Sequence, residues 1–145
     1  MIEIKKLHPK AKTPTYATEG SAGLDLYACH DTAALLRPNA TFVMPTGIAL
    51  SIPRGFCGMI VPRSGLGVKY GVVLGNGTGI IDSDFHGELH VCLWNRSDVA
   101  YSIAPYERIA QMMVIPVVQD WFKEVEDFSL PTERDTIGFG STGKM

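Results

Sequence analysis

Several features that mark common classes of protein are missing from this sequence. Among its 145 residues, no apolar run approaches the ~18 residues that a membrane-spanning helix needs, so we expect no membrane association. The N-terminal stretch MIEIKKLHPK lacks the roughly 7–15-residue apolar core of a secretory signal peptide. The net charge of −2 leaves no broad basic field, which argues against nucleic acid as a partner.

Cysteine is also scarce. The three cysteines, Cys29, Cys57 and Cys92, lie far apart and do not form a C-x-x-C pair, so neither a zinc cluster nor a disulfide framework is indicated. A sparse, odd number of cysteines is typical of a reducing compartment. We therefore expect a cytoplasmic protein, with the nucleus or a virus-infected cell as alternatives.

The sequence is instead rich in apolar residues interrupted by glycine and proline. Its 46% hydrophobic and 19% charged residues exclude a disordered chain, and its length suits one domain. Eleven glycines and prolines fall between positions 47 and 79, where we expect no ordinary helix. Strand-length apolar runs lie between such breakers, at residues 24–27, 41–44, 48–52, 56–61 and 72–74. These features predict a single all-β domain over residues 1–130, followed by a flexible polar arm over 131–145.

The second half of the chain adds longer segments. Residues 88–104 contain neither glycine nor proline, and the alternation over residues 89–94 predicts a strand with both faces largely covered, followed by a turn at 95–98 and an antiparallel return over 99–103. Residues 108–118 form another apolar run. Within 117–128, Val117, Trp121, Val125 and Phe128 recur at helical spacing, so the pattern alone predicts a short amphipathic helix there.

The segment PRSGLGVKYG, residues 62–71, contains a candidate anion site. Ser64 is predicted to cap a short helical turn whose free N–H groups point outward, between Arg63 and Lys69. An ordinary N-cap beside surface charges explains the same residues. The segment alone leaves both interpretations open.

A second candidate is GNGTGIIDSDFHGELH, residues 75–90. Its three closely spaced glycines predict a tight hairpin that a ligand or another backbone approaches closely. Asp82 ends an apolar strand, where a carboxylate can act as a general base. As an alternative, Asp82 and its neighbours are ordinary turn residues.

The same segment also contains residue types that bind metal ions. Asp82, Asp84, His86, Glu88 and His90 occupy alternate positions, which would place them on one face of an unbroken strand. Gly87 argues against such a strand. A calcium loop is disfavoured because Leu93 stands where a bidentate glutamate is needed.

Three further segments attract attention. Asp25, between Leu24 and Leu26 in AGLDLYA, points away from their apolar face, as an ordinary outward residue would. Gln111 is a polar residue within the apolar strand ERIAQMMV, so protein or ligand must satisfy its amide. The segment GFGSTG, residues 138–143, suits either a mobile tail or a lid that lays a ring on a base.

In this order and at these separations, AGLDLYA, PRSGLG, GNGTGIIDSDFHG, ERIAQMMV and GFGSTG resemble the five motifs of the trimeric dUTPase family. The resemblance implies a jelly-roll-like β-barrel that forms a homotrimer, with sites between subunits to which different chains contribute the third motif and the tail. It also implies an extended segment over 117–128 in place of the helix.

The resemblance further implies roles for single residues. Asp25 would hold a water of a triphosphate-bound Mg²⁺, and Arg63, Ser64 and Gly65 would grip the phosphates. Asp82 would activate the attacking water, helped by Gln111. The residues that contact the base and sugar would be Asn76 and Gly79 of the hairpin, which read uracil, and Phe85, which packs under the deoxyribose.

In the tail, the ring of Phe139 would stack on uracil, while polar groups close over the phosphates. The matching residues are Arg134, Gly140, Ser141 and Thr142. The chain departs from the family pattern twice. Phe85 replaces the usual tyrosine but is still expected to exclude a 2′-hydroxyl, and Asp135 and Ile137 replace glycines, which stiffens the lid.

The implied reaction is hydrolysis of dUTP to dUMP and pyrophosphate, which limits uracil in DNA and supplies dUMP for dTMP synthesis. Two alternatives from other classes remain. One is a dCTP deaminase-like enzyme, for which Glu88 is the nearest candidate acid–base residue. The other is a non-catalytic nucleotide-binding regulatory β-domain.

Overall fold

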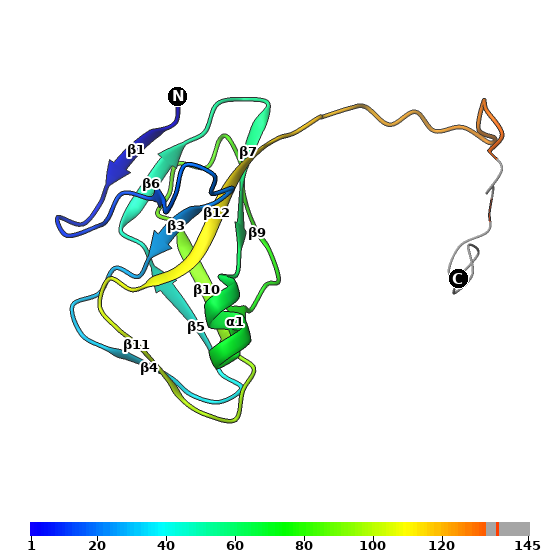
Figure 1. The fold of residues 1–145 in the computed structure, drawn as a ribbon. Coiled ribbons are helices and arrows are strands. Elements are labelled where there is room, and N and C mark those ends of the chain that lie inside the picture. Colours follow the sequence, from blue (N-terminus) through cyan, green and yellow to red (C-terminus); the bar gives the residue numbers. More distant parts are fainter. Residues whose placement is uncertain (133–135, 137–145) are drawn as a thin grey trace.

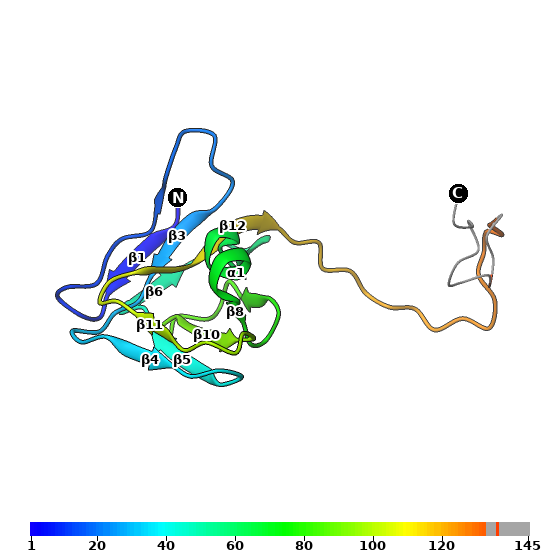
Figure 2. The same ribbon diagram turned by 60° about the horizontal axis from the view of Figure 1, so that its bottom comes forward.

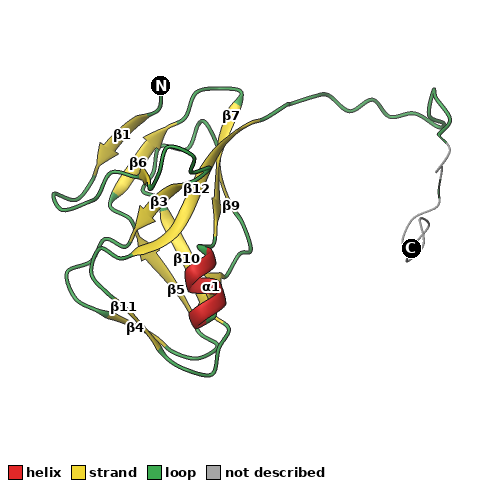
Figure 3. Cartoon of the chain, viewed as in Figure 1, coloured by secondary structure: helices red, strands yellow, loops and turns green. Residues whose placement is uncertain are grey.

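The computed structural model describes residues 1–132 and residue 136. Within this part, the chain folds into twelve strands and one short helix (Figures 1 and 3). The largest sheet contains, in spatial order, β2 (Thr15–Tyr16), β3 (Leu24–Tyr27), β12 (Arg108–Pro116), β7 (Phe56–Val61) and β9 (Gly79–Ile81). A second sheet contains β5 (Thr41–Pro45), β10 (His90–Asn95) and β8 (Val72–Leu74). Two further pairs join β1 (Glu3–Lys6) to β6 (Ile48–Ser51) and β11 (Tyr101–Ile103) to β4 (Ala34–Leu36).

All the strand pairings are antiparallel, and the sheets enclose one apolar core. Alternation along the strands supplies that core, because successive side chains point to opposite faces. In β10, for example, Val91 and Leu93 are buried whereas His90 and Trp94 are exposed. The largest fully buried apolar side chains include Leu26, Leu36, Met44, Ile48, Leu89, Leu93, Ile103, Ile109 and Met112. This arrangement confirms the predicted all-β fold.

Each apolar run predicted as a strand in the first half of the chain contains one, namely β3, β5, β6, β7 and β8. Two predictions for residues 88–104 are wrong. His90 and Trp94 are both exposed, so the outer face of β10 is not largely covered within one chain. Residues 101–103 form β11, which pairs with β4 and not with β10, because Asn95 and Ser97 organise a turn that directs the chain away.

The glycine-rich region contains a short helix, at the place where a short helical turn was predicted, although no ordinary helix was expected in this region. Helix α1 (Ser64–Tyr70) makes two turns despite Gly65 and Gly67, and ends at Gly71 in the left-handed conformation with φ 70°. Gly67 lets the helix approach the sheet, since an added Cβ would lie 3.4 Å from Val73 Cγ1. The contact with β8 therefore offsets the low helix propensity of glycine.

After β12 the chain leaves the body of the molecule. In both views, residues 117–132 extend away from the sheets (Figures 1 and 2). They contain no helix, so the prediction from helical spacing is wrong and the extended segment implied by the family resemblance is confirmed. The spacing misleads because most of the apolar side chains have no core beside them: Trp121 is 95% and Phe128 91% exposed. No helix within the described residues is long and apolar enough to span a bilayer.

Candidate active site

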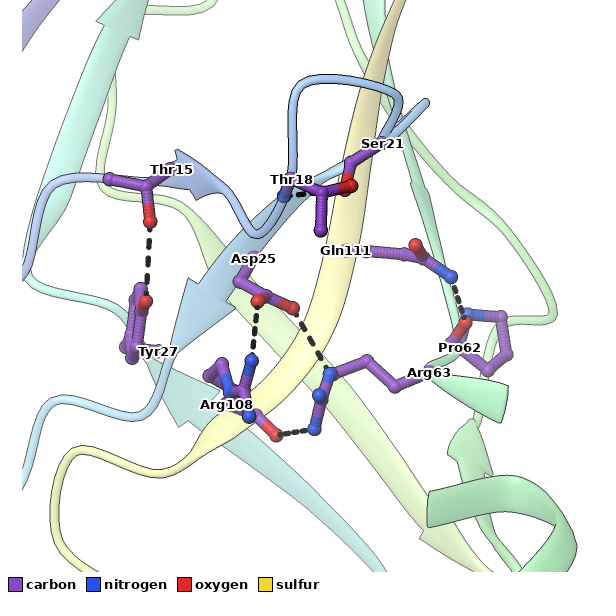
Figure 4. Close-up of polar contacts among 9 residues, drawn as sticks. All are labelled: Thr15, Thr18, Ser21, Asp25, Tyr27, Pro62, Arg63, Arg108 and Gln111. Atoms are coloured by element: carbon purple, nitrogen blue, oxygen red, sulfur yellow. Dashed lines mark hydrogen bonds and ion pairs between the residues drawn. The ribbon is translucent and has the colours of Figure 1, made fainter. Parts of the chain in front are cut away.

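Three segments that are distant in the sequence meet around one cavity of the large sheet. Asp25 on β3 lies opposite Gln111 on β12, and Gln111 in turn lies opposite Val61 at the end of β7. Because Pro62 and Arg63 follow β7 directly, this register brings the start of α1 to the same place (Figure 4). The cavity measures about 260 Å³ and is lined by Ala17, Ser21, Ala22, Gly23, Asp25, Arg63, Ser64, Gly65, Arg108 and Gln111.

Asp25 lies at the centre of a charged cluster. Its Oδ1 accepts a hydrogen bond from Arg63 Nε at 3.1 Å, and its Oδ2 accepts one from Arg108 Nη1 at 3.1 Å (Figure 4). Arg63 Nη1 also donates to the Arg108 carbonyl at 3.1 Å, which ties the two arginines together. Asp25 is only 8% exposed, so interpreting it as an ordinary outward residue is wrong. Two guanidiniums on one carboxylate leave the cluster with one net positive charge, which suits an anionic ligand.

The first turn of α1 forms another wall of the cavity. The N-cap residue is Arg63, which makes no side-chain cap bond, so the prediction that Ser64 caps the helix is wrong. Ser64 is instead the first helical residue, and Gly65 follows with nothing within 4 Å of the place a Cβ would occupy. Backbone N–H groups in the first turn of a helix have no intrahelical acceptor, so they are available for hydrogen bonds.

Gln111 holds the loop before α1 in place. Its Nε2 donates to the Pro62 carbonyl at 2.9 Å, which satisfies part of its amide. Its Oε1 lies where a side chain at position 23 would be, since a Cβ built on Gly23 would be 2.9 Å away. The absence of a side chain at Gly23 therefore allows the amide to reach Pro62. Opposite them, Ser21 Oγ accepts a hydrogen bond from Thr18 N at 3.0 Å, which closes the loop beside the cavity (Figure 4).

The turn at residues 75–78 was predicted to be a hairpin, but the strands on either side of it do not pair with each other. Strand β8 pairs with β10, whereas β9 pairs with β7, so the turn carries the chain from one sheet to the other. The turn is tight because Thr78 N donates to the Asn76 carbonyl at 2.8 Å and Gly77 adopts φ 73°. The close approach predicted for the glycines occurs at Gly75, where an added Cβ would lie 2.9 Å from Cys92 Sγ.

Asp82 and Phe85 lie outside the cavity that contains Asp25. Three strand spacings separate β3 from β9, which amounts to roughly 14 Å across the sheet. The register places Ile81 opposite Gly58 and Gln111 opposite Val61, which adds about 10 Å along the strands. Asp82 instead borders a separate cavity of about 620 Å³ with Arg54, Cys57 and Asp84. One chain therefore does not bring Asp82 together with Asp25 and Gln111.

The metal interpretation of residues 82–90 finds no support in the structure. Among the described residues, no group of three or more His, Cys, Asp or Glu side chains could hold an ion. Residues 82–89 form turns, not an unbroken strand, as Gly87 suggested. Glu88 points to another part of the molecule, where its Oε1 accepts a hydrogen bond from Gly47 N at 2.8 Å.

Arg108 belongs to the cluster but was not predicted as a site residue. It lies 83 positions from Asp25 in the sequence, and only the register of β3 with β12 brings the two together. Its place three residues before Gln111 in ERIAQMMV was the available signal. The predicted tail residues, Arg134, Phe139, Gly140, Ser141 and Thr142, lie outside the described residues, as do Asp135 and Ile137.

Comparison with known proteins gives a consistent result. The model of the dUTPase family matches residues 9–143. The deoxyuridine 5′-triphosphate nucleotidohydrolase of Neisseria meningitidis serogroup B is 52% identical over 98% of this chain and 96% of that protein. The protein of the same name from Albidiferax ferrireducens is 52% identical over 99% of this chain and 97% of its own length.

Solved structures share the fold. A mutant dUTPase of Staphylococcus bacteriophage 80alpha with dUpNHpp superposes with a TM-score of 0.90 at 29% identity, covering 99% of this chain and 98% of the other. A mutant dUTPase from phage phi11 of S. aureus, for which the coordination of a structural Mg(II) ion is described, gives a TM-score of 0.82 at 24% identity. This match covers 90% of this chain and 99% of the phage protein.

Proposed function

Because this chain belongs to the dUTPase family, we propose that it hydrolyses dUTP to dUMP and pyrophosphate, limiting uracil in DNA and supplying dUMP for dTMP synthesis. The observation that carries the proposal is the convergence of Asp25, Arg63 and Gln111 on one cavity with a net positive cluster. A triphosphate carries nearly four negative charges, and the chain as a whole is net negative. Binding therefore has to depend on local donors such as these.

In the proposed reaction, a water molecule attacks the α-phosphorus in line with the leaving pyrophosphate. Asp82 accepts a proton from this water, a new bond forms between the water oxygen and the α-phosphorus, and the bond to the β-phosphate oxygen breaks. Arg63, Ser64 and Gly65 bind the phosphates through the guanidinium and the first-turn N–H groups. Gln111 holds Pro62, and through it the phosphate-binding turn, in position.

The residues around the cavity fit a magnesium ion that arrives on the nucleotide. The described residues offer no cage of carboxylates, and Asp25 is the single carboxylate that lines this cavity. Mg²⁺ typically keeps several waters and binds through substrate phosphates and one or two carboxylates. When bound, the ion would neutralise charge on the phosphates, and Asp25 would accept a hydrogen bond from one of its waters.

Selection of the nucleotide is assigned to the turn at 75–78 and to the residues after β9. Asn76 and the backbone around Gly79 would read uracil, whose donors and acceptors differ from those of cytosine. Sites that hydrogen-bond their substrate can discriminate by ~10⁴-fold or more, because the wrong base leaves buried groups unpaired. Phe85 would pack under the deoxyribose and exclude a 2′-hydroxyl. Phe139, Gly140, Ser141, Thr142 and Arg134 are proposed to close over the bound nucleotide.

A homotrimer would complete this site. The separation of Asp82 from the Asp25 cavity within one chain supports a site to which two chains contribute. The segment 117–132 supports assembly as well, because Val118, Trp121, Phe122 and Phe128 are each more than 90% exposed. Apolar surface of this extent on one extended segment favours contact with another subunit. On this basis residues 1–130 form the domain and 131–145 the arm that closes the site.

The cellular location is proposed from chemistry and relatives. The three cysteines are free, which suits a reducing compartment. The relatives named above with about half of their residues identical come from bacteria, so the proposal places the enzyme in the bacterial cytoplasm.

The test is a substrate panel of dUTP, dCTP, dTTP and UTP, each with and without Mg²⁺. We expect pyrophosphate from dUTP alone, faster with Mg²⁺. Ammonia from dCTP would instead support the deaminase alternative, which the bond between Glu88 and Gly47 already disfavours. Nucleotide binding without turnover of any member of the panel would support the regulatory alternative.

A further inference from the structure

Gly87 is a glycine at a position where the backbone conformation does not require one. It is exposed, and its φ lies outside the left-handed range in which glycine is favoured. A Cβ at this position would nevertheless lie 2.7 Å from Phe85 Cζ, 3.0 Å from Cε2 and 3.5 Å from Cε1. The three nearest atoms all belong to one aromatic ring. The tip of the Phe85 ring therefore occupies the space that any other residue at position 87 would fill.

The backbone between Asp82 and Phe85 is fixed as well. Phe85 N donates to the Asp82 carbonyl at 3.2 Å, so the two residues are the ends of one turn. Phe85 is 44% exposed, and the tip of its ring lies in the open space beside Gly87. The turn hydrogen bond links the backbone of Phe85 to that of Asp82, and the Phe85 ring lies over Gly87, so the three residues are neighbours in one loop.

We propose that Gly87 is a specificity-positioning residue, which seats the Phe85 ring so that the ring rejects a ribose 2′-hydroxyl. The inference rests on the proposed function, because it needs Phe85 to face the sugar. Gly87 itself touches no reacting atom. It acts by leaving room for the ring.

A methyl group at position 87 would push the ring tip toward the sugar or to one side. The tip is the free end of a flexible side chain, so the displacement costs little folding stability. Its effect on selectivity is larger, since misplacing a contact by about 1 Å can cost up to ~10²-fold in rate. We expect Gly87→Ala to lower the ratio of kcat/KM for dUTP over UTP about tenfold, with kcat for dUTP reduced about threefold at most.

The experiment is a double-mutant cycle on the full-length enzyme with Mg²⁺. The variants are Gly87→Ala, Phe85→Ala, the double variant and Gly20→Ala, and each is assayed with dUTP and UTP. Gly20→Ala is the matched control, because its added Cβ meets nothing within 4 Å. We expect each single change at 85 or 87 to lower the ratio, the double variant to match Phe85→Ala, and the control to match the wild type.

The outcomes separate the inference from the function on which it rests. An unchanged ratio in Gly87→Ala, or an equal loss for dUTP and UTP, overturns the role of Gly87 while leaving the enzyme a dUTPase. Further loss in the double variant beyond Phe85→Ala alone also overturns it, because Gly87 would then act by another route. An unchanged ratio in Phe85→Ala would show that the Phe85 ring does not discriminate against the 2′-hydroxyl, and this would overturn the inference as well. Thermal unfolding of all four variants checks that the fold is intact.

Discussion

The Asp25 cluster illustrates how much of a site is decided by single residues and by pairings between them. The resemblance to the five family motifs pointed to Asp25, Arg63 and Gln111, and the structure brings these three together. Neither the burial of Asp25 nor its second partner, Arg108, could be predicted, because both depend on strand register between residues 83 positions apart. Local sequence patterns indicate which residues could bind a ligand or take part in catalysis. The long-range pairing of strands determines which of these residues lie close together.

Replacing Asp25 by asparagine should destabilise the free enzyme. The change keeps the shape but removes the charge shared by Arg63 and Arg108, leaving two guanidiniums near each other without an anion. Because Arg63 and Arg108 keep 26% and 47% side-chain exposure, we expect a loss of only about 1–2 kcal/mol in free energy of unfolding, measured by urea denaturation. Pyrophosphate should restore more stability to this variant than to the wild type.

The control for this prediction is Asp31→Asn. That carboxylate is more than half exposed, and it pairs with Lys10 at 2.7 Å and accepts a hydrogen bond from the Tyr106 hydroxyl at 2.5 Å. Solvent screening should therefore keep its contribution to stability small. Equal losses in the two variants, or no preferential rescue of Asp25→Asn by pyrophosphate, would show that the cluster is not a charge-balanced anion site.

Replacing Asp82 by asparagine tests the proposed base. We expect the dissociation constant for a non-hydrolysable dUTP analogue to stay within about tenfold of the wild type. The activation free energy should rise by about 3 kcal/mol or more, which lowers kcat over a hundredfold. Rapid-quench measurement of pyrophosphate gives kcat, and calorimetry gives the affinity. Asp84→Asn is the matched control, because Asp84 is an exposed carboxylate two residues away. Wild-type turnover in Asp82→Asn would refute the assignment.

At the scale of single elements, sequence predicted the structure of segments that have one apolar face. It failed where contacts with a distant element determine the conformation or the pairing of a segment. Strands β3, β5, β6, β7 and β8 followed from short β-branched and aliphatic runs between breakers. The short helical turn predicted at Ser64 is present as α1, but its continuation through two turns despite two glycines and the pairing of β11 with β4 were not predicted. In α1, packing of Gly67 against β8 outweighs its propensity. In the extended segment 117–132, apolar side chains recur at helical spacing, but no helix forms because there is no core against which their face could pack.

The turn between β5 and β6 gives a prediction for one element. Gly47 has φ 69°, and an added Cβ would lie 2.6 Å from Cys29 Sγ and 2.9 Å from Ala11 Cβ. Gly47→Ala should therefore cost about 3 kcal/mol, from left-handed strain of about 1–2 kcal/mol and overpacking of about 1–3 kcal/mol. Denaturant unfolding measures the loss.

Gly55→Ala separates the two contributions. Gly55 has φ 84° but nothing within 4 Å of an added Cβ, so it reports strain without overpacking. Equal losses of folding stability at positions 47 and 55 would mean that the contact with Cys29 does not contribute.

Burial, followed by the charges of Glu88 and Asp31, raises the pKa of Cys29, so its thiol stays protonated and packs as an apolar group at neutral pH.

At the scale of the whole molecule, the central feature is the distance between the Asp25 cavity and Asp82. Sequence order gave no sign of this separation, because the motifs follow one another along a single chain. Only the sheet order, with β12 and β7 between β3 and β9, reveals it. The fold class was therefore predictable from composition and breakers, whereas the proposed division of the site between chains rests on the family resemblance.

Mixed assemblies test this division. Arg63→Ala and Asp82→Asn chains should each be inactive alone, since each lacks one half of every site. Co-refolded in equal amounts, they should recover about a quarter of wild-type activity, because random symmetric assembly brings an intact half from each chain together at that frequency. Pyrophosphate release before and after mixing measures the recovery. If mixing restores nothing, while the separate variants bind nucleotide and assemble normally, both halves belong to one chain.

The segment after β12 has a consequence for behaviour at low concentration. Trp121 and Phe122 are almost fully in contact with water in a lone chain, at 95% and 104% relative exposure. A lone subunit would lack part of the proposed shared site, and its exposed apolar segment could bind other proteins non-specifically. Newly made chains would avoid this by assembling with further copies of the same chain first. If the proposed trimer forms, the yield of active enzyme should therefore depend on how quickly newly made chains encounter one another.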